Sequence, residues 1–296
     1  MFDTNGVEWA ASGIQSYVQR SDYFHISNEV SMLPTCPDGG DLLGGSTSMC
    51  SKPPHFEVLK LLDVDVVELT GNHNNDYGYQ DYTDTLAWFR DNDMQTVGGG
   101  ATLAEARNPL LLEHNGSTIG IVACNVPGPY YALVNEDPNV LGGVRPGATP
   151  CDKTWLEGEL PALSAEVDVL ILDMQQLEIE DYLPTQDQRF HFRQMADLGA
   201  DVVMGTAAHK PQVYEFYGTN SGNQAFIHYG MGNLYFDQPF WGNMRFFMNT
   251  LYVYDGRLMT VEVFPGIIDE NARPRLMTPE ERENFLFFMF VQHNGF

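Results

Sequence analysis

Side chains that could bind a divalent ion or transfer a proton follow three short strand-like runs of the sequence. Asn72 and His73 come directly after the run 64–69, and His209 follows the run 201–205 within a Thr-Ala-Ala-His stretch. Glu29 stands beside Asn28 at the end of a shorter run. Carboxylate, amide and imidazole groups are the side chains with which proteins hold ions that clamp the oxygens of a phosphoryl group. The chemistry that such residues could support is metal-assisted hydrolysis or transfer.

The elements around these residues predict an α/β sheet with crossover helices. The run 64–69 reads as a buried strand, and a helical spacing follows it in the apolar residues Tyr82, Leu86 and Phe89. The runs 167–172 and 201–205 predict two further strands, and the first of them leads into an expected loop of acids and amides from 173 to 187. Ligands gather outside the carboxyl ends of strands in open α/β sheets. We therefore expect the polar loops to converge on one crevice of one continuous domain.

Turn and cap signals indicate the remaining elements. Asn115-Gly116 and Asp255-Gly256 predict the tight turns of two β-hairpins, because such pairs supply positive φ angles. A helix is expected near Gln186 to Leu198, ended by Gly199. The start of a last helix is predicted by Thr278, Pro279 and Glu281.

The chain is strongly acidic. Forty Asp and Glu residues against 15 Lys and Arg give a formal net charge of -25, which repels phosphate backbones and anionic lipid surfaces. This charge argues against nucleic acid as a partner, and an anionic substrate would need local positive charge such as a metal ion. The longest apolar run, 285–291, is much shorter than the roughly 20 residues that span a bilayer. Because the start at 1–5 is polar and acidic, either the protein is cytosolic or an export signal lies upstream.

Four cysteines bear on the compartment. Cys36 and Cys50 flank a segment rich in Pro, Gly and Ser, and Cys124 and Cys151 repeat this arrangement around another Pro- and Gly-rich stretch. Neither pair has the spacing of a zinc site. We therefore expect the disulfides Cys36–Cys50 and Cys124–Cys151, which would indicate an oxidising compartment. The alternative is four thiols in a cytosolic protein.

Four motifs in a fixed order resemble those of one protein family. They are Ser-Asn-Glu-Val at 27–30, Gly-Asn-His at 71–73 with Asp76 and Gly78 behind it, the stretch 199–209, and Tyr-Gly-Met-Gly-Asn at 229–233. Their order and spacing are similar to those of the CapA/PgsA capsule-synthesis proteins, whose members resemble calcineurin-like metallophosphoesterases. The similarity runs from about Asp22 to the C-terminus. It implies an α/β fold, the metallo-dependent phosphatase-like four-layer αββα sandwich with mixed sheets.

The resemblance also implies a set of metal ligands. Glu29, Asn72 and His209 match metal-binding residues of the family. Gln175 stands where many relatives have a His-Trp-Gly stretch and is the fourth candidate ligand. A mixed set of oxygen and nitrogen ligands suits manganese, iron or zinc. The family's Gly-His-x-Pro-His loop is here Gly-Thr-Ala-Ala-His at 205–209, so one of its two histidines is missing. One ion or none is therefore expected in place of two.

Two residues are expected to be catalytic on the same grounds. His73 matches the imidazole that protonates the leaving group in the family, and Asp76 stands three residues behind it. The family's first motif, a Gly-Asp pair after the first strand, would lie upstream of Met1. Residues 1–296 are therefore expected to form a single domain that lacks its first strand.

These features predict an extracytoplasmic protein acting in synthesis, transfer or anchoring of a capsule-type polymer such as poly-γ-glutamate. As an enzyme it would hydrolyse or transfer a phosphoester or a γ-glutamyl bond. Its partners would be the cell-envelope polymer or its precursor and membrane-bound capsule synthesis proteins. The missing Gly-Asp motif, Gln175 and Ala207 favour an alternative, a binding or scaffold module that has lost the metals.

Two of the polar features also have structural interpretations. Gln175 and Glu178 could belong to a solvated acidic loop, because the whole region is acidic. Asn233 lies on a Gly-rich turn, where an asparagine more often shapes the backbone than binds a ligand.

Overall fold

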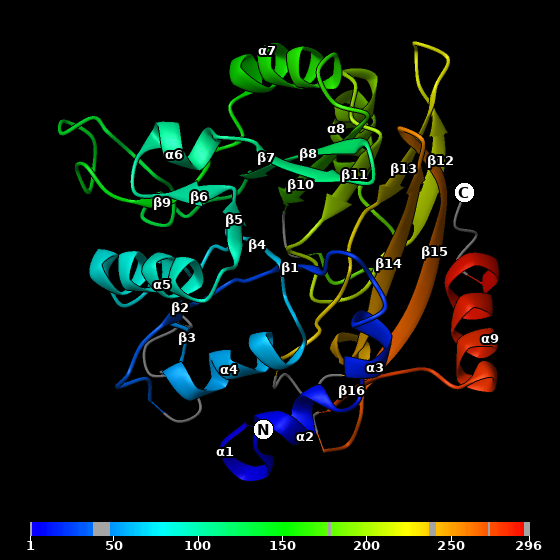
Figure 1. Ribbon diagram of the computed structural model, residues 1–296, viewed down its shortest axis with the longest axis horizontal. Coiled ribbons are helices and arrows are strands. Elements are labelled where there is room, and N and C mark those ends of the chain that lie inside the picture. Colours follow the sequence, from blue (N-terminus) through cyan, green and yellow to red (C-terminus); the bar gives the residue numbers. More distant parts are fainter. Residues whose placement is uncertain (1, 38–47, 177–178, 237–240, 272, 293–296) are drawn as a thin grey trace. The chain divides into compact units, whose positions relative to one another are not determined.

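The computed structural model describes residues 2–37, 48–176, 179–236, 241–271 and 273–292. The chain forms two compact units, each with its own sheets and helices (Figure 1). Unit 1 comprises Leu111–Ile121 and Asp152–Phe296, and unit 2 comprises Phe2–Leu110 and Val122–Cys151. None of the helices in the described ranges is both long and apolar enough to cross a bilayer.

Unit 2 contains a parallel sheet of three short strands. Their order is β1 (His25–Ser27), β4 (Val66–Glu68) and β5 (Gln95–Val97). All three residues of β4 are buried, which confirms the strand expected within 64–69. β-Branched valines favour such a strand because their stiff side chains pack well on a pleated surface.

Two helices of unit 2 pack through aromatic side chains. Helix α4 (Pro53–Leu61) and helix α5 (Tyr79–Asp91) are in contact through Phe56, whose ring centroid lies 5.5 Å from that of Trp88. Helix α5 begins after Gly78, whose φ of +133° favours glycine. It buries Tyr82 and Phe89, as its helical spacing predicts.

The rest of unit 2 consists of short elements and two disulfides. The disulfides join Cys36 to Cys50 and Cys124 to Cys151, which confirms both predicted pairs. The short elements are α1 (Phe2–Asn5), α2 (Val7–Ala11), α3 (Gln15–Val18), α6 (Leu103–Arg107), the ladder of β2 (Ser31–Met32) with β3 (Cys50–Ser51), and that of β6 (Gly99–Gly100) with β9 (Gly147–Ala148).

Unit 1 is built around a mixed sheet of six strands. In order these are β12 (Tyr214–Gly218), β13 (Gln224–His228), β11 (Val202–Gly205), β10 (Val169–Gln175), β8 (Ser117–Asn125) and β7 (Leu110–His114). Strands β10, β11 and β13 run parallel, and β12 runs antiparallel to β13. Strand β8 is divided between the two units after Ile121. The helices α7 (Lys153–Ser164) and α8 (Gln186–Asp197) belong to the same unit.

One sequence-based expectation in this sheet is wrong. The expected loop from 173 to 187 does not begin at Asp173, because β10 continues to Gln175 and all seven of its residues are buried. Asp173 and Met174 pair with Met204 and Gly205 of β11. Backbone pairing to a neighbouring strand on the inside of the sheet thus outweighs the low strand preference of Asp173.

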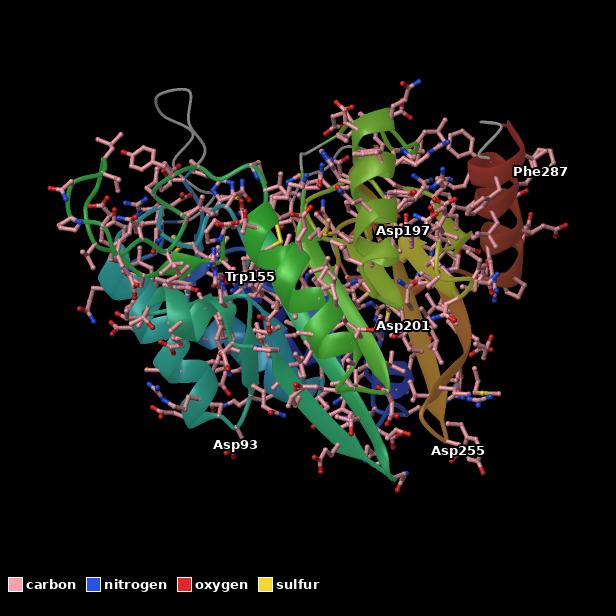
Figure 2. All side chains as sticks on the ribbon, turned by 90° about the horizontal axis from the view of Figure 1, so that it is seen from above. Asp93, Trp155, Asp197, Asp201, Asp255 and Phe287 are labelled. Carbon is pink, nitrogen blue, oxygen red and sulfur yellow. A yellow bond between two sulfur atoms is a disulfide. The ribbon has the colours of Figure 1, made fainter. Side chains whose placement is uncertain are left out.

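The C-terminal part of unit 1 is a long hairpin followed by a helix. Strands β14 (Arg245–Tyr254) and β15 (Arg257–Ile268) are joined at Asp255 and Gly256, as predicted (Figure 2). Strand β16 (Pro274–Leu276) pairs with β15. Helix α9 (Pro279–Phe287) starts with the predicted capping box of Thr278 and Glu281.

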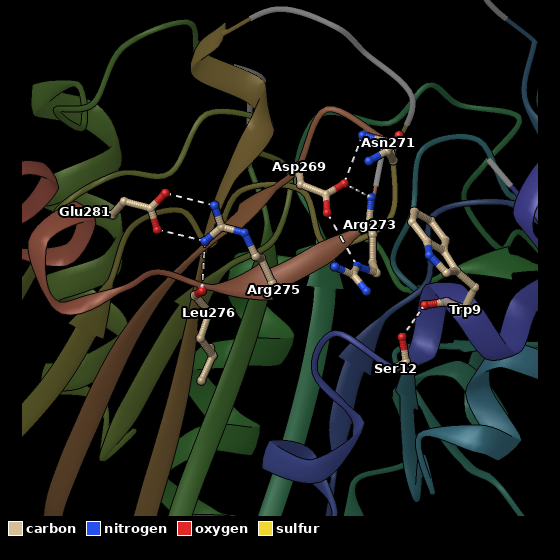
Figure 3. A network of polar contacts seen from close by, with 8 residues as sticks. All are labelled: Trp9, Ser12, Asp269, Asn271, Arg273, Arg275, Leu276 and Glu281. Carbon is tan, nitrogen blue, oxygen red and sulfur yellow. Dashed lines mark hydrogen bonds and ion pairs between the residues drawn. The ribbon is translucent and has the colours of Figure 1, made fainter.

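Ion pairs fix the approach to this last helix. The two terminal guanidinium nitrogens of Arg275 donate to Glu281, at 2.7 and 2.8 Å (Figure 3). These bonds lower the pKa of Glu281 to about 2. In the preceding turn, Asp269 accepts a hydrogen bond from the backbone N–H of Arg273 at 3.0 Å.

The sheets and helices of the two units give a mixed α/β fold with mixed sheets, as expected. The four-layer arrangement and the single domain stay predictions.

Candidate metal-binding and catalytic site

Two predicted site loops lie side by side in unit 2. Strands β1 and β4 run parallel, with Ser27 opposite Glu68, so the residues that follow both strands leave the sheet at the same edge. Val30 forms a parallel bridge with His73. A Cβ atom on Gly71 would come within 2.4 Å of the Cα atom of Glu29. The structure thus brings together the loop of Glu29 and the loop of Asn72 and His73, as the sequence predicts.

The imidazole of His73 is held by Asp76. Its Nδ1 atom lies 2.6 Å from Asp76 Oδ2, and the side chain of Asp76 is only 2% exposed. The same carboxylate oxygen accepts a hydrogen bond from the backbone N–H of Met49 at 2.8 Å. A carboxylate on Nδ1 sets the tautomer and the orientation of an imidazole, so Nε2 is the nitrogen that can exchange a proton with a substrate. This geometry is what a general acid at His73 requires.

Two buried asparagines shape the loop between these residues. Asn74 Nδ2 donates to the carbonyl oxygen of Leu69 at 2.9 Å. Asn75 Nδ2 donates to the carbonyl oxygens of Tyr131 and Pro146, at 2.8 and 3.0 Å. Buried backbone carbonyls require such partners. The two amides therefore stabilise the backbone that carries His73 and Asp76.

A buried carboxyl group, which the sequence did not single out, stands at the end of β4. Glu68 is 0% exposed, and its Oε1 atom accepts hydrogen bonds from the backbone N–H of Thr70 at 2.5 Å and from the Thr70 hydroxyl. Burial, with a smaller contribution from the charge of Glu29, raises the pKa of Glu68 to about 7. Among the described residues its Oε2 atom has no hydrogen-bond partner. The negative charge of Glu29 thus acts on this end of β4, and a carboxylate ligand at Glu29 fits a positive ion.

In unit 1 the imidazole of His209 is held by an amide. Its Nδ1 atom lies 2.8 Å from Asn233 Oδ1, and Asn233 Nδ2 donates to the carbonyl oxygen of Asn243 at 3.2 Å. When Nδ1 donates to an amide oxygen, the lone pair of a neutral imidazole is on Nε2. That tautomer can ligate a metal. Asn233 therefore orients His209, a role that its position on a Gly-rich turn did not indicate.

Gln175 occupies the last position of β10 and is 1% exposed. Its Oε1 atom accepts a hydrogen bond from the Thr206 hydroxyl at 2.9 Å. Thr206 in turn follows β11 and donates its backbone N–H to the carbonyl oxygen of Met174 at 3.1 Å. The interpretation of Gln175 as part of a solvated acidic loop is therefore wrong. Glu178, its companion in that interpretation, lies outside the described residues.

The predicted site residues thus form two groups. Unit 2 brings together Glu29, Asn72, His73 and Asp76, and unit 1 holds Gln175 and His209. The described residues contain no group of three or more His, Cys, Asp and Glu side chains arranged to hold a metal ion. The predicted ligand set includes only two side chains of these types, beside the amides of Asn72 and Gln175. Joint ligation of one ion by both groups stays a prediction.

Comparisons with known proteins give consistent results. A family model described as "Bacterial capsule synthesis protein PGA_cap" matches residues 3–238. The chain is 29% identical over 184 residues to the PGA biosynthesis protein CapA of Bacillus subtilis, covering 62% of this chain and 45% of the relative. It is 22% identical over 289 residues to the capsule biosynthesis protein CapA of Bacillus anthracis, covering 95% and 66%. The chain thus spans about half to two thirds of the length of these relatives.

Solved structures show likeness at low sequence identity. A hypothetical protein from Thermus thermophilus aligns with a TM-score of 0.50 and 14% identity, over 88% of this chain and 94% of that one. The calcineurin-like phosphoesterase YfkN from Bacillus subtilis aligns with a TM-score of 0.43 and 17% identity, over 81% and 72%.

Proposed function

The chain belongs to the bacterial capsule synthesis protein family PGA_cap, and we propose that it acts in synthesis, transfer or anchoring of a cell-envelope polymer. The reaction is metal-assisted hydrolysis or transfer at a phosphoester or a γ-glutamyl bond. The polymer or its precursor is the substrate, and membrane-bound capsule synthesis proteins are the partners. The names of the two CapA relatives, which refer to capsule and PGA biosynthesis, support this assignment.

The observation that carries the proposal is the pairing of His73 with Asp76 beside the loop of Glu29. Asp76 fixes Nδ1 of the imidazole at 2.6 Å, and the bridge between Val30 and His73 holds the two loops together. The proton on Nε2 then lies on the side of the imidazole ring away from Asp76, where it can be given to a leaving group. His73 acts as the general acid that protonates the leaving group, and Asp76 stabilises the charged imidazole that precedes transfer.

The residues that would hold an ion are Glu29, Asn72 and His209, with Gln175 as a fourth ligand. A bound manganese, iron or zinc ion would supply Lewis-acid polarisation of the bond to be broken. The carboxylate of Glu29 attracts a cation, and Asn233 favours the tautomer of His209 with its lone pair on Nε2. The protein's own contribution is to orient these ligands and to place the His73 proton.

The site of action is outside the cytoplasm. Two disulfides within one unit support this location, because such bonds persist in oxidising compartments. The net charge of -25 repels a polyanionic chain. A local cation is therefore needed to hold an anionic polymer, which is consistent with a metal-dependent reaction.

The direct test is hydrolysis of two model substrates by the purified protein with added manganese. Bis(p-nitrophenyl) phosphate reports phosphoester cleavage, and γ-glutamyl p-nitroanilide reports cleavage at a γ-glutamyl bond. We expect His73→Ala to lower kcat by about 10²- to 10⁴-fold, the usual contribution of general acid catalysis. Activity that survives this substitution removes the mechanism.

A matched control is available on helix α4. His55 also pairs with an aspartate, because its Nε2 atom lies 2.9 Å from Asp3 Oδ1, but it belongs to none of the predicted site motifs. His55→Ala therefore removes an imidazole of the same kind and should leave kcat unchanged. Equal losses in the two variants would mean that the loss reflects general destabilisation.

The second candidate function is a scaffold module that keeps the fold without the metal. It is favoured by the lack of a three-residue metal cluster among the described residues, and by Gln175, a neutral side chain at a predicted ligand position. Metal analysis of the intact protein separates the two candidates. Stoichiometric transition metal supports the enzyme, and its absence after purification with added manganese, iron and zinc supports the scaffold.

A further inference from the structure

The carboxyl group of Glu68 has an unusual location for an acid. It is fully buried at the end of β4, after the buried valines Val66 and Val67. Burial of a carboxyl group is unfavourable unless hydrogen bonds compensate for the lost water. An apolar side chain would pack at this position at lower free-energy cost. The hydrogen bonds of Glu68 therefore indicate what the carboxyl group does.

Glu68 stands where two neighbouring strands end. Its Oε1 atom accepts two hydrogen bonds from Thr70, one from the backbone N–H and one from the hydroxyl. Ser27 is the register partner of Glu68 on β1, and it opposes the effect of burial on the pKa of this carboxyl group. The carboxyl group therefore lies where the last residue of β1 meets the first residues after β4, and its hydrogen bonds hold Thr70.

Thr70 is fixed from a second direction as well. Its carbonyl oxygen accepts a hydrogen bond from Asn125 Nδ2 at 2.7 Å, and its side chain is 0% exposed. The next residue is Gly71, whose backbone lies directly against that of Glu29. The position of Thr70 therefore determines the path of the chain from the end of β4 to Asn72, and with it how close this loop comes to Glu29.

We propose that Glu68 is a positioning residue, which holds the loops of Glu29 and of Asn72 and His73 at the spacing that their chemistry requires. It acts through its hydrogen bonds to Thr70 and does not itself touch the ion or the substrate. The inference rests on the proposed function, because it assigns to Glu68 the geometry of that same site. Positioning groups behind metal ligands change metal affinity or activity by about 10- to 100-fold when they are removed.

The test compares Glu68→Leu with Glu68→Gln in the whole chain. Leucine removes both acceptors, whereas glutamine keeps an Oε1 acceptor for Thr70 in nearly the same shape. The control is Asp201→Asn, which alters a carboxyl group of unit 1 that accepts a hydrogen bond from the Leu170 N–H at 2.9 Å. Three properties are measured: the affinity for Mn²⁺ by calorimetry, the ¹⁵N resonances of the His73 imidazole without metal, and thermal unfolding.

The expected result is a difference between the two Glu68 variants. Glu68→Leu should weaken Mn²⁺ binding by about 10- to 100-fold and move the His73 resonances. Glu68→Gln and Asp201→Asn should retain the affinity and the spectrum of the wild type. A folded Glu68→Leu protein with wild-type affinity and wild-type His73 resonances would overturn the proposal. Equal changes in the leucine and glutamine variants would also overturn it, because the hydrogen bonds would then be irrelevant.

A second pair of variants decides the matter if Glu68→Leu does not fold. Thr70→Val removes the hydroxyl donor without changing charge, and Thr70→Ser keeps it. The valine variant should show the altered His73 spectrum and the serine variant should not. A wild-type protein that binds no Mn²⁺ contradicts the proposed function alone, because the His73 resonances of the metal-free variants still test the positioning role.

Discussion

The backbone of Gly71 packs directly against the backbone of Glu29. A Cβ atom on Gly71 would lie 2.4 Å from Glu29 Cα and 2.6 Å from the Glu29 carbonyl oxygen, well inside van der Waals contact. Both neighbours are backbone atoms, so no rotation of a side chain can relieve the clash. Only glycine therefore allows the loop after β4 to approach the loop after β1 this closely.

Substitution of Gly71 by alanine should separate these two loops. We expect Gly71→Ala to lower the free energy of unfolding by about 1–3 kcal/mol, as overpacking commonly does, and to weaken Mn²⁺ binding. Urea unfolding and calorimetry measure the two effects. The control is Gly158→Ala in α7, where no heavy atom lies within 4 Å of the added Cβ. It should stabilise the protein by up to about 1 kcal/mol, because alanine favours a helix. A Gly71→Ala protein as stable as the wild type would contradict the close packing.

The buried carboxyl of Glu68 predicts a specific dependence of stability on pH. Its folded pKa of about 7 lies above the ordinary value of 4.5, so the folded state holds the proton more tightly than the unfolded chain. The tighter binding of the proton adds to the free energy of unfolding. This contribution is fully present below pH 4.5 and is lost as the pH rises through 7. Between pH 5.5 and 8 the loss amounts to about 2 kcal/mol. Glu29 and Tyr82 are the other titratable groups that interact with this carboxyl.

The variant Glu68→Gln should remove this dependence in protein freed of metal by a chelator. Urea unfolding at pH 5.5 and pH 8 measures the difference in unfolding free energy between variant and wild type, in which the other titrating groups largely cancel. That difference should shift by about 2 kcal/mol in favour of the variant at the higher pH. The lower pH stays above the pI of about 4.4, where low net charge would promote association. A difference that is the same at both values would show that Glu68 does not titrate in this range.

The pairing of Asn233 with His209 predicts an effect on metal affinity. Asn233→Ala removes the acceptor that keeps the proton on Nδ1 of the imidazole, and we expect Mn²⁺ binding to weaken by about 10- to 100-fold. The chain offers a matched control in His228, whose Nδ1 lies 3.1 Å from Asn249 Oδ1 and which is fully buried. Asn249→Ala should reduce stability and leave the affinity for Mn²⁺ unchanged. Calorimetric titration of both variants distinguishes a site residue from a packing residue.

Local signals in the sequence were sufficient for the elements that such signals determine. Asn115-Gly116 and Asp255-Gly256 form the predicted turns, with positive φ at each residue, and Thr278 forms the predicted capping box. These features depend on a few neighbouring residues, so distant contacts seldom override them. The approach of the loop of Glu29 to the loop of Asn72 and His73 was also predictable, because parallel strands end at the same edge of a sheet.

Features that depend on distant contacts were missed or mistaken. The residues from Asp173 to Gln175 give no local sign of a strand. They are buried because β10 pairs with β11 and because the Thr206 hydroxyl donates to the Gln175 side chain. The role of Asn233 depends on His209, which lies 24 residues away. Glu68 could have been noticed, because a single acid among the valines of a buried strand requires a partner, and Thr70 stands two residues later.

The two disulfides predict how the protein responds to reduction. Cys36–Cys50 and Cys124–Cys151 close segments with sequence separations of 14 and 27, and loss of either should lower the free energy of unfolding by about 3–4 kcal/mol. The intact mass after alkylation measures the bonds directly. We expect no alkylated cysteine before reduction and four after it. Four alkylated cysteines in protein exported and purified without reductant would contradict both bonds and remove the structural support for an extracytoplasmic location.

The second disulfide should affect the candidate site more than the first. Cys124 precedes Asn125, whose Nδ2 atom holds the carbonyl oxygen of Thr70 at 2.7 Å. The carbonyl oxygen of Asn125 also accepts a hydrogen bond from the Cys151 N–H at 3.0 Å. The disulfide Cys124–Cys151 therefore fixes the end of β8, which supports the loop of Asn72. Replacing Cys124 and Cys151 by serine should therefore weaken Mn²⁺ binding, whereas replacing Cys36 and Cys50 should lower stability with a smaller effect on binding. Calorimetry with each double variant below its unfolding temperature makes the comparison, and equal affinities in the two would mean that Asn125 keeps its position without the covalent link.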